Sequence, residues 1–324
     1  MPPVAALRFP FSRVLLPRTR LAYIHLRNLL TDAKRDRAAR ISGYVAVSLP
    51  EELVILYLLA GEVVNATVRD AKGSRAISIS SALEAVPHEP EYGEICFHEA
   101  DEEQLGCMYA THAIAAEPWP GGMNAQDPAT LFPYLSAMTF DGVVEIIANE
   151  SVNYLVFRNG SVARAFLSAS HHGTTVDRVA KLFTRDGRVG DLRVGRWSVP
   201  LSLPIQAPPA LIQAYRDLTA SLVQRLVDNG RDSAPTIAEH ARQNLVATHP
   251  VLDGFPLSGR PMREPLADTE SLTLAVGAWI REVMWAAVDH DSMSPEALLK
   301  ELTWERRHMF QSAGLYAEMP WKVL

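Results

Sequence analysis

The sequence contains little cysteine and no long apolar run. Its two cysteines, Cys96 and Cys107, belong to no C-x-x-C motif and to no cluster with metal-ligand spacing. This usage fits a reducing compartment, so we expect a cytoplasmic protein. No stretch approaches the roughly 20 apolar residues of a membrane span. Arginines interrupt every early apolar run before it reaches the length of a signal-peptide core. We therefore expect no signal peptide and no membrane partner.

The common catalytic and nucleotide-binding motifs are also missing. The chain holds no P-loop, no G-x-G-x-x-G, no G-x-S-x-G and no H-E-x-x-H. We predict no cofactor, no metal and no catalytic residue. The sequence therefore favours a non-enzymatic protein over an enzyme.

An enzyme of unfamiliar type, hydrolytic or metal-dependent, is the first alternative. It would use a histidine cluster, for which the candidates are His98, His112, His171, His172 and His290. The tripeptide 289–291 places an imidazole between two carboxylates, a set that can bind a divalent cation. The simpler interpretation is that these are surface residues, and that Asp289, His290 and Asp291 complement the dipoles of flanking helices.

Charge is modest in total but unevenly spread. The net charge is −6, yet residues 1–40 hold nine Lys and Arg against two Asp, and residues 84–103 hold eight acidic residues with no Lys or Arg. These segments either form two solvated faces, or meet each other or a charged partner. The second functional alternative, a nucleic-acid-binding regulator, would use the basic segment. The acidic net charge argues against it.

The dominant pattern is a repeat with an offset of 99 residues. Residues 43–68 and 142–167 align without a gap, so that Gly43 falls on Gly142. Each copy predicts two apolar strands, a turn and a third strand. The chain is therefore organised around two equivalent hairpins.

Each hairpin turn is predicted at a glycine. Gly61 follows Ala60 in the first copy, and Gly160 follows Asn159 in the second. Asn-Gly between apolar runs is a strong signal for a type I′ turn, which needs positive φ at both central residues.

The repeat extends beyond the hairpins. A short helix is expected after each one, and the strand predicted at Gly93–Phe97 is echoed by 190–194 at an offset of 97. A helix is also expected over Asp101–Ile114, with acidic residues in its first turn.

These patterns predict an α+β fold with two tandem small repeat units containing antiparallel hairpins, followed by an all-helical C-terminal domain. Pro-rich connectors at 117–128 and 199–209 separate the parts. The predicted boundaries are 1–118 for the first unit with its basic segment, 128–200 for the second unit and 208–324 for the helical domain.

Both hairpins share the pattern G-x-V, a strand, and then L/F-x-x-G-x-x-x-x-A. The matching residues are Leu58, Gly61 and Ala66 in the first copy and Phe157, Gly160 and Ala165 in the second. With this pattern, about residues 20–200 resemble the small α+β domains of the PATAN type, named for the N-terminal region of a cyanobacterial patterning response regulator. Leu58 departs from the usual phenylalanine, and no receiver module adjoins. The resemblance implies a protein-interaction unit of bacterial signalling and no catalytic residue.

We therefore predict a bacterial signalling adaptor or scaffold that binds another protein, with self-association as an alternative. The helical domain is the predicted partner surface, because tryptophan and arginine are enriched at interface hot spots. Four of the six tryptophans lie in the last 46 residues: Trp279, Trp285, Trp304 and Trp321.

The candidate partner-binding residues lie on one side of the last helix, predicted from Pro295 to about Gln311. A core face is expected at Leu298, Leu302, Glu305 and Met309. The other side carries the candidates, Trp304, Arg307 and His308. The alternative is that Trp304 packs on a neighbouring helix or beneath the C-terminal Pro320-Trp321.

Overall fold

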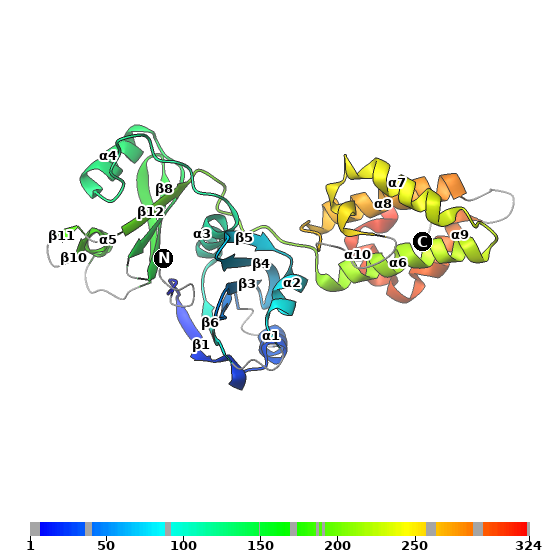
Figure 1. The fold of residues 1–324 in the computed structure, drawn as a ribbon, viewed down its shortest axis with the longest axis horizontal. Helices are drawn as coiled ribbons and strands as arrows, with labels where there is room; N and C mark the ends of the chain where they lie inside the picture. The colour runs from blue at the N-terminus through cyan, green and yellow to red at the C-terminus, as the bar shows by residue number, and fades with distance from the viewer. Residues whose placement is uncertain are drawn as a thin grey trace. The chain divides into compact units, whose positions relative to one another are not determined.

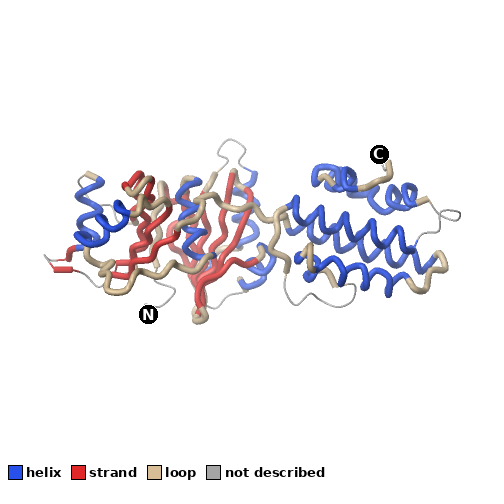
Figure 2. The backbone as a smooth tube through the Cα atoms, turned by 90° about the horizontal axis from the view of Figure 1, so that it is seen from above, coloured by secondary structure: helices blue, strands red, loops and turns tan. Residues whose placement is uncertain are grey.

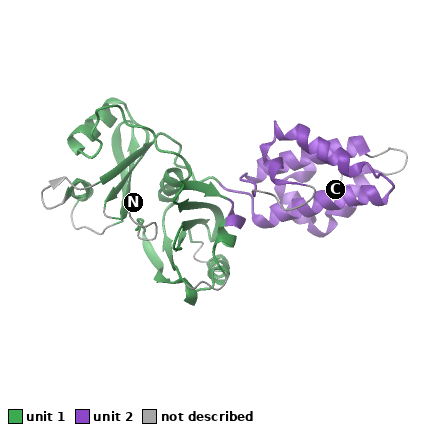
Figure 3. Cartoon of the chain, in the orientation of Figure 1, with its two compact units in different colours: residues 1–77, 82–204 green, residues 78–81, 205–324 purple. Residues whose placement is uncertain are grey.

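A computed structural model of the chain describes residues 7–35, 41–87, 92–148, 150–168, 174–185, 188–189, 192–256, 264–287 and 294–322. The chain forms two compact units, coloured separately in Figure 3. The first contains residues 1–77 and 82–204, and the second contains residues 78–81 and 205–324.

The first unit contains two antiparallel sheets (Figure 1). The larger has the order β1-β6-β2-β3-β4-β5, and the smaller has the order β12-β7-β8-β9. The strands of the larger sheet are β1 (Arg13–Arg20), β2 (Gly43–Ser48), β3 (Leu53–Leu59), β4 (Glu62–Asp70), β5 (Gly73–Ile77) and β6 (Glu94–Glu99). Those of the smaller sheet are β7 (Gly142–Ala148), β8 (Ser151–Arg158), β9 (Ser161–Leu167) and β12 (Leu192–Trp197), and a separate short hairpin pairs β10 (Thr184–Arg185) with β11 (Arg188–Val189).

Helices accompany the sheets and form the second unit. The helices between residues 26 and 183 are α1 (Leu26–Arg35), α2 (Ile79–Ala85), α3 (Glu102–Ala113), α4 (Pro128–Ala137) and α5 (Thr175–Phe183). Those after residue 205 are α6 (Pro209–Asp228), α7 (Ala234–Val246), α8 (Thr269–Ala287), α9 (Pro295–Thr303) and α10 (Arg307–Ala313). All described strands precede residue 198, and the described chain from 205 onward contains helices and loops (Figure 2). The predicted α+β class with a helical C-terminal part is confirmed.

The strand pairing of the two repeats is equivalent. Gly43 pairs with Leu58 and Gly142 pairs with Phe157, an offset of 99 on both strands. Both hairpins also carry a register shift at the equivalent place, after Tyr57 in one and after Val156 in the other. The first three strands of each repeat therefore match residue for residue.

The predicted offset of 97 for the fourth strand is wrong. Ile95 faces Val47, and Val194 faces Ile146, so β6 and β12 are related by 99 residues like the rest of the repeat. An error of two residues keeps every side chain on its face, because strand side chains alternate with a period of two. The apolar pattern alone could not reveal it.

The turn glycines lie against neighbouring backbone. Gly61 and Gly160 have φ of +83° and +73°, and each follows a residue with φ near +50°. A Cβ on Gly61 would stand 2.5 Å from the carbonyl oxygen of Ala33 in α1, and one on Gly160 would stand 2.8 Å from Cα of Ser136 in α4. Glycine thus allows both the turn and the close approach of the preceding helix.

Gly43 and Gly142 open the first strand of each repeat. A Cβ at either position would lie 2.1 Å from a carbonyl oxygen of the fourth strand, that of His98 or of Trp197. The repeats therefore share the same close strand contact at the start of each hairpin.

The two sheets share one core. Side chains from the inner faces of both sheets and from α3 form a single buried cluster, which includes Tyr44, Ile55, Tyr57, Leu105, Met108, Val143, Tyr154, Val156 and Trp197. Helix α3 lies between the sheets in Figure 1. The connector predicted at 117–128 thus joins two repeats within one compact unit.

The outer faces of the sheets are covered by helices. The larger sheet packs against α1 and α2 through Leu26, Ala33 and Ala82, together with Val86 just after α2. The smaller packs against α4 and α5 through Leu131, Leu135, Val179 and Phe183. The central strands are consequently buried on both faces, which explains their nearly continuous apolar sequences.

The outer edge of each fourth strand is covered differently. In the first repeat, β1 pairs with β6, and Arg13 and Arg18 form ion pairs with Glu99 and Glu94. The basic N-terminal and acidic segments therefore meet as neighbouring strands. In the second repeat the connector caps carbonyl oxygens of β12: Glu117 N donates to Arg196 O at 3.0 Å, Trp119 Nε1 to Val194 O at 2.9 Å and Gln126 Nε2 to Leu192 O at 2.7 Å.

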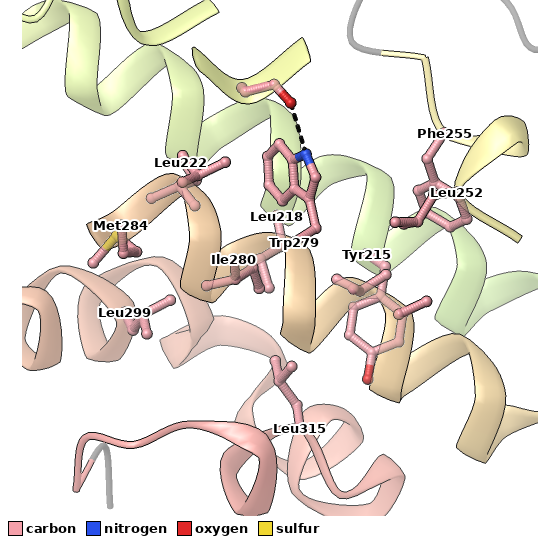
Figure 4. Close-up of a cluster of buried hydrophobic side chains, with 14 of the residues drawn as sticks. Tyr215, Leu218, Leu222, Leu252, Phe255, Trp279, Ile280, Met284, Leu299 and Leu315 are labelled. Carbon is pink, nitrogen blue, oxygen red and sulfur yellow. Dashed lines mark hydrogen bonds between the residues drawn. The ribbon is translucent and has the colours of Figure 1, made fainter. Parts of the chain in front are cut away.

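The second unit has its own core, shown in Figure 4. Trp279 is 2% exposed among Leu218, Leu222 and Ile280, and its Nε1 donates to Ala238 O at 2.9 Å. Among the described residues, no helix combines the length and the apolar character that crossing a membrane requires.

Candidate functional site

The candidate partner-binding residues lie where the last predicted helix breaks. Helix α9 begins at a Ser294 cap, whose Oγ accepts from Ala297 N at 3.3 Å, and ends at Thr303. A 3-10 turn over Trp304–Arg306 then separates it from α10. The single helix predicted from Pro295 to about Gln311 is therefore wrong.

The break also corrects the predicted core face. Glu305 and Met309 are exposed, and Phe310 is the fully buried residue of α10, packed on the Tyr215 ring. A 3-10 turn has 3.0 residues per turn instead of 3.6, which rotates the following residues by about 60° over three positions. The periodicity of α9 consequently does not continue into α10.

Trp304 lies on the surface of the second unit. Its side chain is 57% exposed, so it is neither buried beneath the C-terminal segment nor packed into the core. The Arg307 guanidinium carbon lies 4.5 Å from the ring centroid. A cation–π contact of this kind at an exposed site contributes about 0.5–1 kcal/mol and favours the stacked arrangement of the two side chains.

The surface around Trp304 is fixed to α6 by two ion pairs. Arg306 contacts Asp217 at 2.6 Å, and Glu301 pairs with Arg225. His308 is exposed beside Arg307 on α10. Trp304 and His308 are thus exposed and Arg307 is half-buried, and we call these three residues at the helix break the Trp304 patch.

A second exposed tryptophan provides a comparison. Trp285 on α8 is also 57% exposed, but its ring makes an edge contact with Trp321, with centroids 6.3 Å apart. Among the described residues, no Lys or Arg makes a cation–π contact with the Trp285 ring. Exposure alone therefore does not distinguish the two sites, whereas the stacked arginine does.

The described histidines do not converge. His112 is buried in α3, where its Nδ1 lies 2.8 Å from Met108 O and its ring contacts Phe9. His98 lies on β6 and contacts Tyr44 and Phe11 instead. His171, His172 and His290, with Asp289 and Asp291, lie outside the described residues. Within the described ranges, no three His, Cys, Asp or Glu side chains are grouped to hold a metal ion.

One buried acid, Glu145, was not among the residues predicted from the sequence. Glu145 on β7 faces the core between the sheets, and this burial raises its pKa from 4.5 to about 7, although Arg69, Thr111 and Arg193 oppose the shift. Burial likewise lowers the pKa of His112 to about 4. In the first repeat the equivalent strand position is the apolar Ala46. A carboxylate at this position of the second repeat is the sequence feature that could have identified Glu145.

Comparisons of the chain with protein-family models, with curated proteins and with solved structures find no match. The resemblance of the hairpins to PATAN-type domains stays a prediction that rests on the residues of the two motifs.

Proposed function

We propose that this protein is a non-enzymatic adaptor or scaffold that binds another protein through the Trp304 patch. The observation that carries the proposal is the exposed Trp304 indole with the Arg307 guanidinium stacked on it. Such a pair presents a large apolar ring and a cation in a favoured geometry, which reduces the side-chain entropy lost when a partner covers it.

The first unit supports this role as a rigid scaffold. Its two sheets and α3 share one core, and the fourth-strand edges are covered by β1 and by the connector. Exposed strand edges are the usual sites of unwanted pairing, and these two are protected. The free cysteines, Cys96 and Cys107, are in keeping with a cytoplasmic location. The hairpin motifs favour a place in bacterial signalling.

Nucleic acid is a weaker candidate partner. Arg13, Arg18 and Lys34 of the basic segment each pair with a glutamate, which neutralises part of the positive charge that phosphates would need. The patch itself combines an aromatic ring with one stacked cation, a composition typical of protein interfaces.

The test is affinity purification from the native host, followed by mass spectrometry, with the wild-type chain and two variants. Trp304→Ala/Arg307→Ala removes the stacked pair. Trp285→Ala removes an equally exposed tryptophan and serves as the matched control. We expect the double variant to lose the captured protein by more than about tenfold, as for a hot spot of 2 kcal/mol, and the control to retain it.

Two further measurements make the outcome decisive. Both variants should keep a cooperative thermal transition within a few degrees of wild type, because the substituted side chains lie on the surface. Capture of the chain itself would identify self-association, to be confirmed by the loss of the oligomer in the double variant. Equal capture by all three proteins would contradict the proposal.

A further inference from the structure

The first unit contains a pocket that the proposed adaptor function does not use. Its volume is about 210 Å³, and it lies on the inner face of the larger sheet, between β1, β2, β6 and the N-terminal segment. The lining is mainly apolar, with Phe9, Phe11, Ala46 and Leu53 among the contributors. An apolar cavity of about 150 Å³ holds benzene, so this pocket has room for one substituted ring.

The second repeat shows the same place filled. At the offset of 99, Cys96 corresponds to Gly195 and His98 corresponds to Trp197. The Trp197 indole lies across Gly195, is 5% exposed and donates from Nε1 to Ile114 O at 2.8 Å. In the first repeat the smaller imidazole and the Cys96 side chain leave the space open.

The polar groups of the pocket have defined hydrogen-bonding roles. Tyr44 Oη lies 3.1 Å from Pro10 O and 2.8 Å from His98 Nδ1. A carbonyl oxygen can only accept, and we therefore assign the single Tyr44 hydroxyl hydrogen to Pro10 O and the Nδ1 proton of His98 to its hydrogen bond with Tyr44. Nε2 of His98 is then an acceptor that fits a ligand donor. Burial lowers the pKa of His98, which favours the neutral ring.

The charged groups of the lining favour a monoanion. Arg18 is paired with Glu94, whereas Arg8 forms no ion pair with a described residue. Two guanidinium groups against one carboxylate leave one positive charge at the pocket. A carboxylate is the planar anion that a guanidinium binds with two parallel hydrogen bonds.

We propose that this pocket binds a small aromatic monocarboxylate that carries a hydroxyl group. The ring packs among the apolar and aromatic side chains, the carboxylate pairs with Arg8, and the hydroxyl donates to His98 Nε2. The inference is independent of the Trp304 patch, which belongs to the other unit. The proposed adaptor would then also bind a small molecule.

Calorimetric titration of the full chain with matched probes tests the chemistry. We expect 4-hydroxybenzoate to bind with a Kd on the order of 1 mM or tighter, the range reached by a ligand of ten heavy atoms. Benzoate, which lacks the donor, and 4-hydroxybenzamide, which lacks the charge, should each bind at least about fivefold more weakly. Equal binding of the three probes, or no binding of 4-hydroxybenzoate at about ten times the expected Kd, would overturn the proposal.

Variants locate the site. Cys96→Gly/His98→Trp copies the filled arrangement of the second repeat and should abolish binding. Arg8→Gln should weaken 4-hydroxybenzoate at least about fivefold and leave 4-hydroxybenzamide unchanged, which decides the question even if the double variant does not fold. Arg20→Gln, an equal change of charge on β1 outside the lining, should bind like wild type. Identical binding by Arg8→Gln and Arg20→Gln would contradict the assignment.

Thiol modification gives an independent readout of position. Cys96 lines the pocket and is half-buried, with its pKa raised by burial to about 11, whereas Cys107 is fully buried. Saturating 4-hydroxybenzoate should slow the labelling of Cys96 and leave that of Cys107 unchanged. Labelling of Cys96 at the same rate with and without the probe would place any bound probe elsewhere.

Discussion

The indole of Trp197 lies so close to Gly195 that a Cβ atom on Gly195 would stand 2.5 Å from ring atom Cη2 and 2.8 Å from Cζ3. The ring is held in this position by its hydrogen bond to Ile114 O and by the shared core of the two sheets. The second repeat thus fills, with one side chain, the space that the first repeat leaves open.

Gly195→Ala should destabilise the first unit by about 1–3 kcal/mol, because the indole cannot move without disturbing the core. Gly121→Ala is the control, since nothing lies within 4 Å of its Cβ position. The midpoint of urea unfolding measures both. A Gly195→Ala protein as stable as the control would show that the ring moves freely.

Gly160→Ala should cost more than Gly122→Ala by at least about 1 kcal/mol. Both glycines have positive φ, +73° and +79°, so each alanine pays a similar conformational cost. Only at Gly160 would the Cβ also meet backbone, 2.8 Å from Cα of Ser136 in α4, where a backbone shift is required. The free energies of unfolding in urea separate the cost of positive φ from the cost of the backbone clash. Equal losses of stability in the two variants would exclude a role for the close helix contact.

Glu145→Gln should stabilise the first unit increasingly as the pH rises from about 4.5 to 7. Burial raises the folded-state pKa of Glu145 from 4.5 to about 7, so in this window the folded protein keeps a proton that the unfolded chain releases. Wild-type stability therefore falls as the pH rises through the window, by up to about 3 kcal/mol, and glutamine avoids the loss.

The measurement is urea unfolding of wild type and Glu145→Gln between pH 4 and 8. His112, whose depressed pKa has the opposite effect of lowering stability in acid, is present in both proteins and cancels in the difference. Glu51→Gln, at an exposed loop residue, is the control and should show no such trend. A stability difference that stays constant with pH would contradict the raised pKa.

The sequence determined the features that depend on neighbours along the chain. The turns at Gly61 and Gly160 could be predicted because a tight hairpin turn requires positive φ, and only one or two residues decide whether the chain can adopt it. The helix over Glu102–Ala113 followed from its acidic start, and Asp101 caps it by accepting from Gln104 N at 2.8 Å. The equivalence of the two hairpins could be predicted because the same strands and turns require the same pattern of apolar residues and glycines in both copies.

Strand β1 was missed because its sequence shows no regular alternation. It is an edge strand with Pro17 in its middle and mostly exposed side chains, as edge strands tolerate. Its place beside β6 is set by long-range backbone pairing and by ion pairs with Glu94 and Glu99. No local pattern encodes those partners.

The tertiary structure alone decided which faces meet. Strands β2, β3, β7 and β8 are mainly apolar on both faces, so their sequences indicate that both faces are buried without showing what covers them. The packing of the sheets and α3 into one core, the exposure of Trp304 in a 3-10 turn and the pocket beside His98 all depend on contacts between residues far apart in sequence. The apolar periodicity of a segment specifies which of its faces is buried. The segment that packs against that face is determined by the shape of the surfaces that meet in the folded chain.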